Sequence, residues 1–119
     1  MLRWTAVLLA IAMTLGLLVG GAQPVAVGLF TPPWDKLVHA CVFALLAGAM
    51  GYASGLRGAR MVLVGFGGAM AVGIADEWHQ MFLPGRSAGL DDLAADAIGA
   101  AAGALALLAR KRVKAWLLA

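Results

Sequence analysis

The sequence predicts an all-α protein: a polytopic membrane four-helix bundle with its N and C termini in the cytoplasm. Hydrophobic residues make up 63% of the 119 residues and charged residues only 13%, against roughly a quarter in soluble proteins. The apolar residues form four long runs. Most basic residues lie before the first run, between the second and third runs, or after the fourth. A water-soluble chain of this length could not bury so much apolar surface.

We expect a single domain over residues 1–119, with helices at about 4–22, 36–56, 61–82 and 91–109. Each run is near the ~20 residues that cross a hydrocarbon core, if the polar ends of the third and fourth enter the membrane. The runs are long, and polar and apolar residues do not alternate within them, so they favour helices over the strands of a barrel. The first run has a second interpretation as a cleaved signal peptide, with Arg3 ahead of it and Gly20-Gly21-Ala22 as the cleavage site.

Charge predicts the orientation. With a cytoplasmic N-terminus, four crossings leave only Lys36 and Arg86 of the nine Lys and Arg residues outside, as the positive-inside rule requires. Two tryptophans, Trp4 and Trp116, then lie at the inner interface, and the other two lie at the outer one. The basic residues form no face with interleaved aromatics, so the net charge of +3 does not indicate a nucleic-acid partner.

The carboxylates have the opposite distribution, because all six fall on the outer side. At about 1.5 Å per residue, Asp76 lies roughly 24 Å above the inner boundary and Asp96 roughly 21 Å above it. Both would then lie inside a core about 30 Å thick, where an ionised carboxylate must face the bundle, find a partner or become protonated. The six are Asp35, Asp76, Glu77, Asp91, Asp92 and Asp96.

Residues three or four positions apart lie on the same face of a helix, and this spacing places several polar residues on shared faces. The pairs are Asp35 with His39, Glu77 with Gln80, and Asp92 with Asp96. The last face continues as Gly99 and Gly103, a small-xxx-small pattern that lets another backbone approach closely. Pro84-Gly85 forms a turn before Arg86, which could bind two carboxylates of the cluster or a phosphate or carboxylate on a ligand.

Four segments in fixed order resemble the VanZ-like family of small bacterial membrane proteins. They are Asp35-Lys36-Leu37-Val38-His39, Glu77-Trp78-His79-Gln80, Pro84-Gly85-Arg86-Ser87, and Asp92-Leu93-Ala94-Ala95-Asp96 followed by Ala97-Ile98-Gly99. The family shows D-K-x-x-H, E-x-x-Q, an arginine after the third helix, and D-x-x-x-N-x-x-G. The match covers about residues 34–103, and Asp96 stands where the family usually has asparagine.

The resemblance implies a four-helix, multi-pass protein of the bacterial cytoplasmic (inner) membrane. It links founding members to resistance to glycopeptide antibiotics, notably teicoplanin, and it implies no established reaction. Membrane lipids and a lipid-linked cell-wall precursor are therefore the expected partners. Neither the residues nor the resemblance predicts a cofactor or an oligomeric state.

Three functions are compatible with the polar residues. The first is recognition of a lipid or cell-wall precursor headgroup in an outward pocket, with Asp35, Gln80, Arg86 and Asp96 binding the ligand. The second is an intramembrane hydrolase or transferase, with Glu77 or Asp92 as acid/base and His39 as proton carrier. The third is a structural or partner-binding bundle in which the cluster only fixes helix register.

Several of these residues also have plainer interpretations. Asp35 could cap the second helix, and Lys36 could be a solvated or headgroup-contacting amine. His39 could make a structural hydrogen bond to a carboxylate, carry a proton or bind a metal, whereas His79 is expected at the interface. The chain lacks H-E-x-x-H or a comparably close histidine pair, so we assign no metal ligands.

Overall fold

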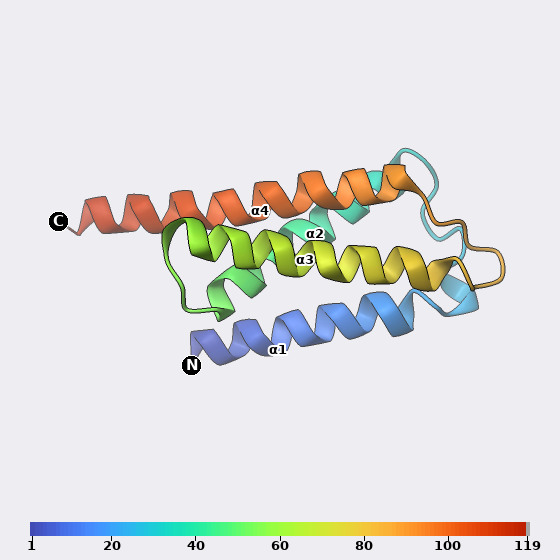
Figure 1. Cartoon of the computed structure of the whole chain (residues 1–119), viewed down its shortest axis with the longest axis horizontal. Coiled ribbons are helices and arrows are strands. Elements are labelled where there is room, and N and C mark those ends of the chain that lie inside the picture. The colour runs from blue at the N-terminus through green and yellow to red at the C-terminus, as the bar shows by residue number, and fades with distance from the viewer. Residues whose placement is uncertain (119) are drawn as a thin grey trace.

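The computed structural model describes residues 1–118, which form four long helices lying side by side (Figure 1). This part of the chain contains no strand, which confirms the all-α prediction. Each helix is long and apolar enough to cross a membrane, the first when its π-helical extension is included. The helices are α1 (Leu2–Leu15, extended by Gly16–Gly20), α2 (Trp34–Ala53), α3 (Gly58–Gln80) and α4 (Leu90–Leu117).

The helix ends differ from the sequence prediction most at α4, which continues beyond residue 109 to Leu117. The extra turns consist mainly of Ala, Leu, Arg and Lys, all strong helix formers. The last turns of α4 extend beyond the other helices (Figure 1). In contrast, α2 ends at Ala53, before Gly55 adopts a positive φ of 70° that ordinary residues rarely adopt.

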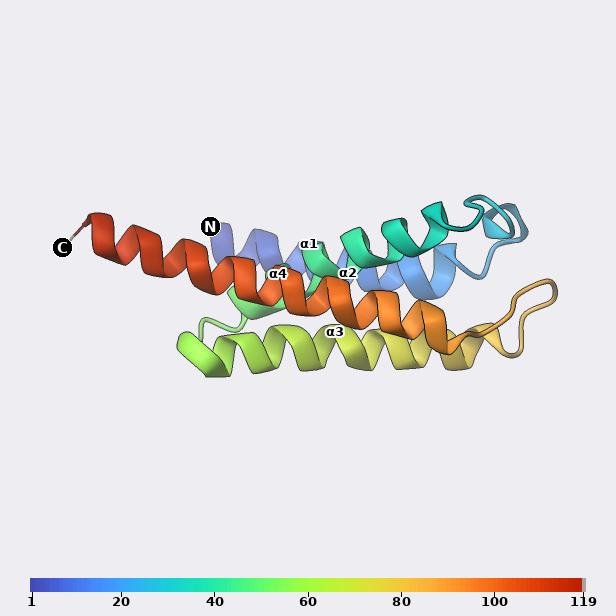
Figure 2. The ribbon, with the colours of Figure 1, turned by 90° about the horizontal axis from the view of Figure 1, so that it is seen from above.

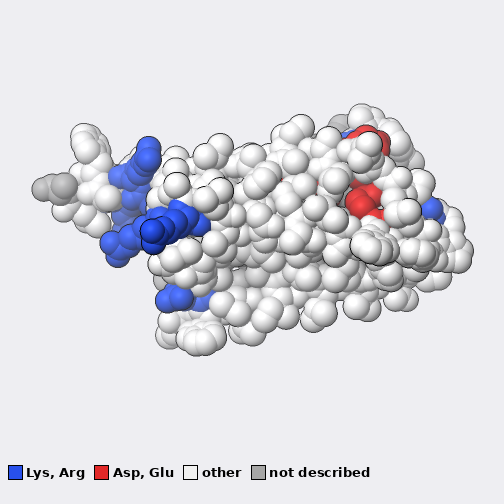
Figure 3. Space-filling model, in the orientation of Figure 1, with Lys and Arg blue, Asp and Glu red and all other residues white. Residues whose placement is uncertain are grey.

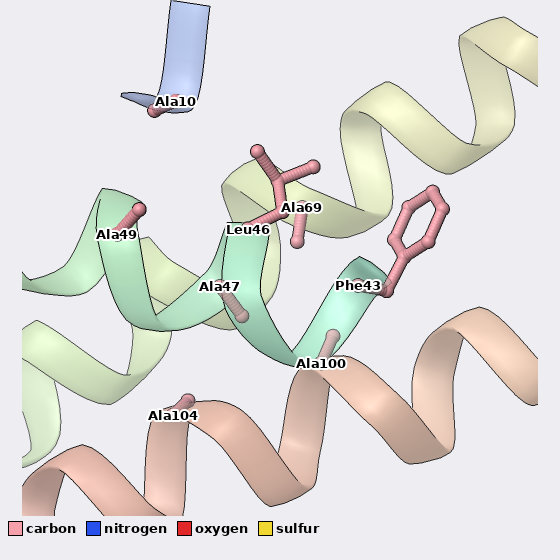
Figure 4. Close-up of a cluster of buried hydrophobic side chains, with 8 residues drawn as sticks. All are labelled: Ala10, Phe43, Leu46, Ala47, Ala49, Ala69, Ala100 and Ala104. Atoms are coloured by element: carbon pink, nitrogen blue, oxygen red, sulfur yellow. The ribbon is translucent and has the colours of Figure 1, made fainter. Parts of the chain in front are cut away.

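The core lies around α2, which packs against the other three helices and most extensively against α4. Alanines dominate this core, and Phe43 and Leu46 are its largest fully buried apolar side chains on α2 (Figure 4). Small residues suit a membrane bundle, because lipid competes for apolar contacts and close backbone packing becomes the main source of helix association. The alanines are Ala10, Ala47, Ala49, Ala69, Ala100 and Ala104.

Two glycines bring α4 directly onto α2. A Cβ atom on Gly99 would overlap the carbonyl of Ala40, and one on Gly103 would overlap the carbonyl of Ala44. The predicted close-packing face of the fourth helix is thus confirmed, and its partner is α2. Because α2 and α4 both start at the same end of the bundle, this contact brings their polar first turns together.

Charge is divided between the two ends of the bundle (Figure 3). The N-terminus, the last turns of α4 and most Lys and Arg lie at one end, which we call the basic end (Figures 1 and 3). All six carboxylates lie at the opposite end, where α2 and α4 begin and α3 finishes; we call this the acidic end. The long axis of the molecule, 54 Å, runs along the helices between these ends (Figures 1 and 2).

Candidate functional site

Lys36 connects the first turns of α2 and α4. Its Nζ lies 3.0 Å from Asp35 Oδ2 and 2.9 Å from Asp91 Oδ2, and it also donates to Asp92 Oδ1. Lys36 was expected as a solvated or headgroup-contacting amine; its side chain is 31% exposed, but its ammonium also pairs with three carboxylates. The motif around it gave no indication of this role, because Asp92 lies 56 positions away in sequence. One ammonium thus offsets part of the charge of three carboxylates.

Asp35 does not cap α2. The helix begins at Trp34, Pro33 occupies the N-cap position, and no side chain caps the first turn. Asp35 instead lies within that turn, where a negative charge interacts favourably with the helix dipole. Its Oδ2 contacts Lys36, while its Oδ1 is buried without a hydrogen-bond partner among the described residues.

His39 lies one turn deeper and pairs with α4. Its Nδ1 lies 2.8 Å from Asp96 Oδ1, and the Asp96 side chain is only 1% exposed. The His39 ring stacks on Phe43 with an interplanar angle of 2° and a centroid separation of 6.4 Å. The hydrogen bond to a carboxylate was anticipated for His39, but its acceptor is Asp96 rather than Asp35. Two contacts therefore fix the imidazole orientation.

Gly73 on α3 leaves the space that this pair occupies. A Cβ there would lie 3.0 Å from Phe43 Cε1 and 3.1 Å from Asp96 Oδ2, both closer than ordinary packing. The absence of a side chain at Gly73 lets the Asp96 carboxylate and the Phe43 ring approach α3. The His39–Asp96 pair consequently lies where α2, α3 and α4 meet.

The end of α3 contributes a second buried polar group. Gln80 Nε2 donates to Asp76 Oδ2 at 2.7 Å, so Gln80 pairs with Asp76 rather than with Glu77 as its spacing suggested. Glu77 Oε2 accepts from the Gly89 N–H at 2.8 Å, just before α4 begins. Glu77 Oε1 is buried and has no partner in the described chain. Asp76, which was not among the predicted site residues, is also buried.

Arg86 anchors the connection between α1 and α2. Its Nη2 donates to the Gly21 carbonyl at 2.8 Å, and its Nη1 lies 3.5 Å from the Ala26 carbonyl. Within residues 1–118 it forms no ion pair with the carboxylate cluster, which was one of its two expected roles. Its Nε is buried and makes no hydrogen bond there. This N–H donor is therefore unpaired within the described residues.

A cavity of about 310 Å³ opens among these groups. The connection between α1 and α2 and the turn after α3 form its walls, and the polar ends of the helices complete it. Glu77 and Asp96 do not line it, although both bind groups beside it. The polar residues that line it are Asp35, His39, Gln80, Arg86, Ser87 and Asp92.

The carboxylates mostly contact lysine, histidine, glutamine or backbone donors. Over residues 1–118, no three His, Cys, Asp or Glu side chains are grouped so that they could hold a metal ion. The polar residues that line the cavity, His39 among them, can instead accept and donate hydrogen bonds.

We compared the chain with known protein families, curated proteins and solved structures. Residues 4–111 match the family model described as VanZ/LLP1. The chain belongs to the VanZ/LLP1 family. Membership of VanZ/LLP1, together with four helices suited to crossing a membrane, makes this chain a multi-pass membrane protein. The comparisons found no matching curated protein and no matching solved structure.

The residues of the VanZ-like motifs lie together in the polar cluster at the acidic end. The aspartate, lysine and histidine of D-K-x-x-H all enter the polar cluster, and its lysine and histidine each bind a carboxylate of the motif on α4. The E-x-x-Q residues join it from α3, and the arginine after α3 lines the cavity. Asp96, at the position of the usual VanZ asparagine, accepts the His39 hydrogen bond.

Proposed function

We propose that this VanZ/LLP1 protein recognises the polar headgroup of an envelope lipid or lipid-linked cell-wall precursor in the cavity at the acidic end. The supporting observation is that two lining residues have buried polar atoms without partners: Asp35 Oδ1, an acceptor, and Arg86 Nε, a donor. Buried polar groups in folded proteins are nearly always hydrogen-bonded. A ligand that offers both a donor and an acceptor satisfies them.

The charges of the cavity narrow the ligand class. Asp35 and Asp92 share the single ammonium of Lys36, so an amine or hydroxyl donor on the ligand finds an acceptor beside them. Arg86 uses two of its five N–H donors on backbone carbonyls, and its unpaired donors, the buried Nε among them, suit a phosphate or carboxylate. A headgroup that carries both an anion and an amine or hydroxyl therefore fits this cavity better than a purely apolar molecule.

The proposed orientation places the acidic end outside the cytoplasmic membrane, because most basic residues lie at the other end. The cavity would then face the headgroups of the outer leaflet and lipid-linked precursors outside the cell. Binding such a precursor would also give this protein a route to alter glycopeptide susceptibility, as the VanZ resemblance implies.

The test measures the lipids that co-purify with the protein from native membranes, by mass spectrometry. Asp35→Asn is compared with Asp91→Asn, because both carboxylates contact Lys36 but only Asp35 lines the cavity. We expect one headgroup class to be enriched over the bulk membrane, and to lose that enrichment in Asp35→Asn alone. Bulk composition in wild type, at equal folded yield, would count against headgroup recognition and favour a structural or partner-binding bundle.

Arg86→Lys provides a second variant for the anionic part of the headgroup. Lysine retains the charge but lacks the planar set of donors that reaches two carbonyls and leaves Nε free. We expect it to lose the enrichment while the protein still folds. Retention of the same lipid by Arg86→Lys would remove Arg86 from the binding site.

A second candidate is an intramembrane hydrolase or transferase that acts on the same lipid class. The observation that favours it is the His39–Asp96 pair, since a carboxylate that binds one ring nitrogen orients the imidazole for proton transfer. His39 lines the cavity, whereas Asp96 lies behind it. Glu77 and Asp92 remain the carboxylates proposed for acid/base chemistry.

Turnover of labelled envelope lipid by the reconstituted protein distinguishes the two functions. His39→Gln should abolish turnover, whereas His79→Gln, exposed at the same end, should leave it unchanged. Glu77→Gln and Asp92→Asn then identify which carboxylate takes part. Headgroup enrichment without turnover in wild type would leave recognition as the function.

A further inference from the structure

A second, larger cavity lies at the opposite end of the bundle. It is a groove of about 930 Å³ whose walls come from α1, α2 and α4. Its inner part is apolar, with Leu9, Leu45 and Leu107 among its lining residues. Gly48 leaves part of its floor open, since a Cβ on Gly48 would come only within 3.9 Å of the Gly103 carbonyl.

The outer part of the groove is basic. Five of the nine Lys and Arg residues line it, and all six carboxylates lie at the other end of the bundle. Within residues 1–118 none of these five forms an ion pair, so the neutralising charge must come from elsewhere. The five are Arg3, Arg57, Arg110, Lys111 and Lys114.

The basic residues are arranged along the groove rather than spread around the bundle. Arg110, Lys111 and Lys114 continue the face of α4 that carries Gly103 and Leu107, because helical positions three or four apart are neighbours. Lys111 Nζ lies 5.2 Å from the centre of the Tyr52 ring, which keeps its charge beside the groove. Arg60 and Arg112 are exposed and do not line it.

The length of the groove suits a lipid chain. Gly103 and Lys114 mark its extent on α4, and at 1.5 Å per residue they lie roughly 16 Å apart. Its apolar part is therefore directed toward the middle of the membrane and its basic part toward the interface. This order, apolar inside and cationic at the surface, is complementary to a membrane phosphate with an acyl chain.

We propose that this groove binds an anionic glycerophospholipid, with an acyl chain against α2 between α1 and α4 and the phosphate among the basic residues. A second copy of the chain inserted in the same orientation is a poorer occupant, because it would bring another basic end against this one. The site is separate from the cavity at the acidic end, and it does not depend on the function proposed there.

The test uses the full chain in nanodiscs that contain equal amounts of phosphatidylglycerol and phosphatidylcholine with identical acyl chains. Native mass spectrometry measures how many lipids of each kind stay bound. We expect phosphatidylglycerol to be retained preferentially. Arg110→Gln with Lys114→Gln should reduce that preference about tenfold, whereas Arg60→Gln with Arg112→Gln, which removes the same charge outside the groove, should not.

Equal retention of the two lipids by wild type, or an equal loss in both double variants, would overturn the proposal. All four substituted side chains are exposed, so the variants should fold. Gly48→Leu tests the acyl-chain contact without changing charge, with Gly67→Leu as its control because nothing lies within 4 Å of a Cβ there. Gly48→Leu should reduce retention of both lipids; unchanged retention in folded protein would contradict the assigned chain position.

Discussion

The His39 imidazole on α2 and the Asp96 carboxylate on α4 lie 2.8 Å apart, although 57 positions separate them in sequence. This distance depends on Gly99, one turn further along α4, where the absence of a side chain lets α4 approach the Ala40 carbonyl. The polar pair and the glycine contact lie on the same helix interface. Helix packing and site geometry are therefore coupled, and disturbing one should disturb the other.

Asp96→Ala should destabilise the protein by about 1–3 kcal/mol, because it leaves the His39 Nδ1 without its buried acceptor. Asp96→Asn should cost less, since the amide oxygen can still accept that hydrogen bond. Reversible unfolding in mixed micelles measures both. Asp91→Ala is the control, because that side chain is 71% exposed and should leave stability unchanged. Equal losses in the two Asp96 variants would mean that the charge matters, not the hydrogen bond.

Lys36 should be coupled more strongly to Asp92 than to Asp91. The Asp92 side chain is 16% exposed and that of Asp91 is 71% exposed, so solvent screens the second pair more. Double-mutant cycles with Lys36→Met, Asp92→Asn and Asp91→Asn measure the two couplings. We expect about 1 kcal/mol or more for Lys36 with Asp92. A larger value for Lys36 with Asp91 would refute Asp92 as the stronger partner of Lys36 on α4.

Gly99→Ala should destabilise the bundle by about 1–3 kcal/mol, because the new methyl group would overlap the Ala40 carbonyl and force α4 away from α2. Gly67→Ala makes the same change where nothing lies within 4 Å, and it should be neutral or slightly stabilising. Thermal unfolding gives the comparison. Similar effects at both positions would indicate that helix propensity, rather than the α2–α4 contact, determines the outcome.

The membrane orientation can be tested with single cysteines in a Cys41→Ala background. Ala88 lies in the connection after α3 at the acidic end, and Ala59 lies at the start of α3 at the basic end; both are exposed. A membrane-impermeant maleimide applied to intact spheroplasts should label Ala88→Cys but not Ala59→Cys. Permeabilised membranes should label both. The reverse pattern would place the acidic end in the cytoplasm and exclude an outward-facing cavity.

The sequence by itself determined the class of the fold. Long apolar runs predict membrane-spanning helices because hydrocarbon offers no hydrogen bonds to the backbone, so local composition is sufficient. Helical spacing identified the close-packing face with Gly99 and Gly103. The order of the motifs indicated the family, which the comparison then confirmed. These are local properties of the chain, or patterns along it.

Only the tertiary structure decided which residues of the polar cluster contact one another. Spacing within one helix paired His39 with Asp35 and Glu77 with Gln80, but His39 contacts Asp96 and Gln80 contacts Asp76. Helical spacing identifies residues on a shared face, but it does not specify which neighbouring helix that face meets. The role of Lys36 depends on the same information, because two of its three carboxylates come from the first turn of α4. Those contacts exist only once two glycines have brought α4 against α2.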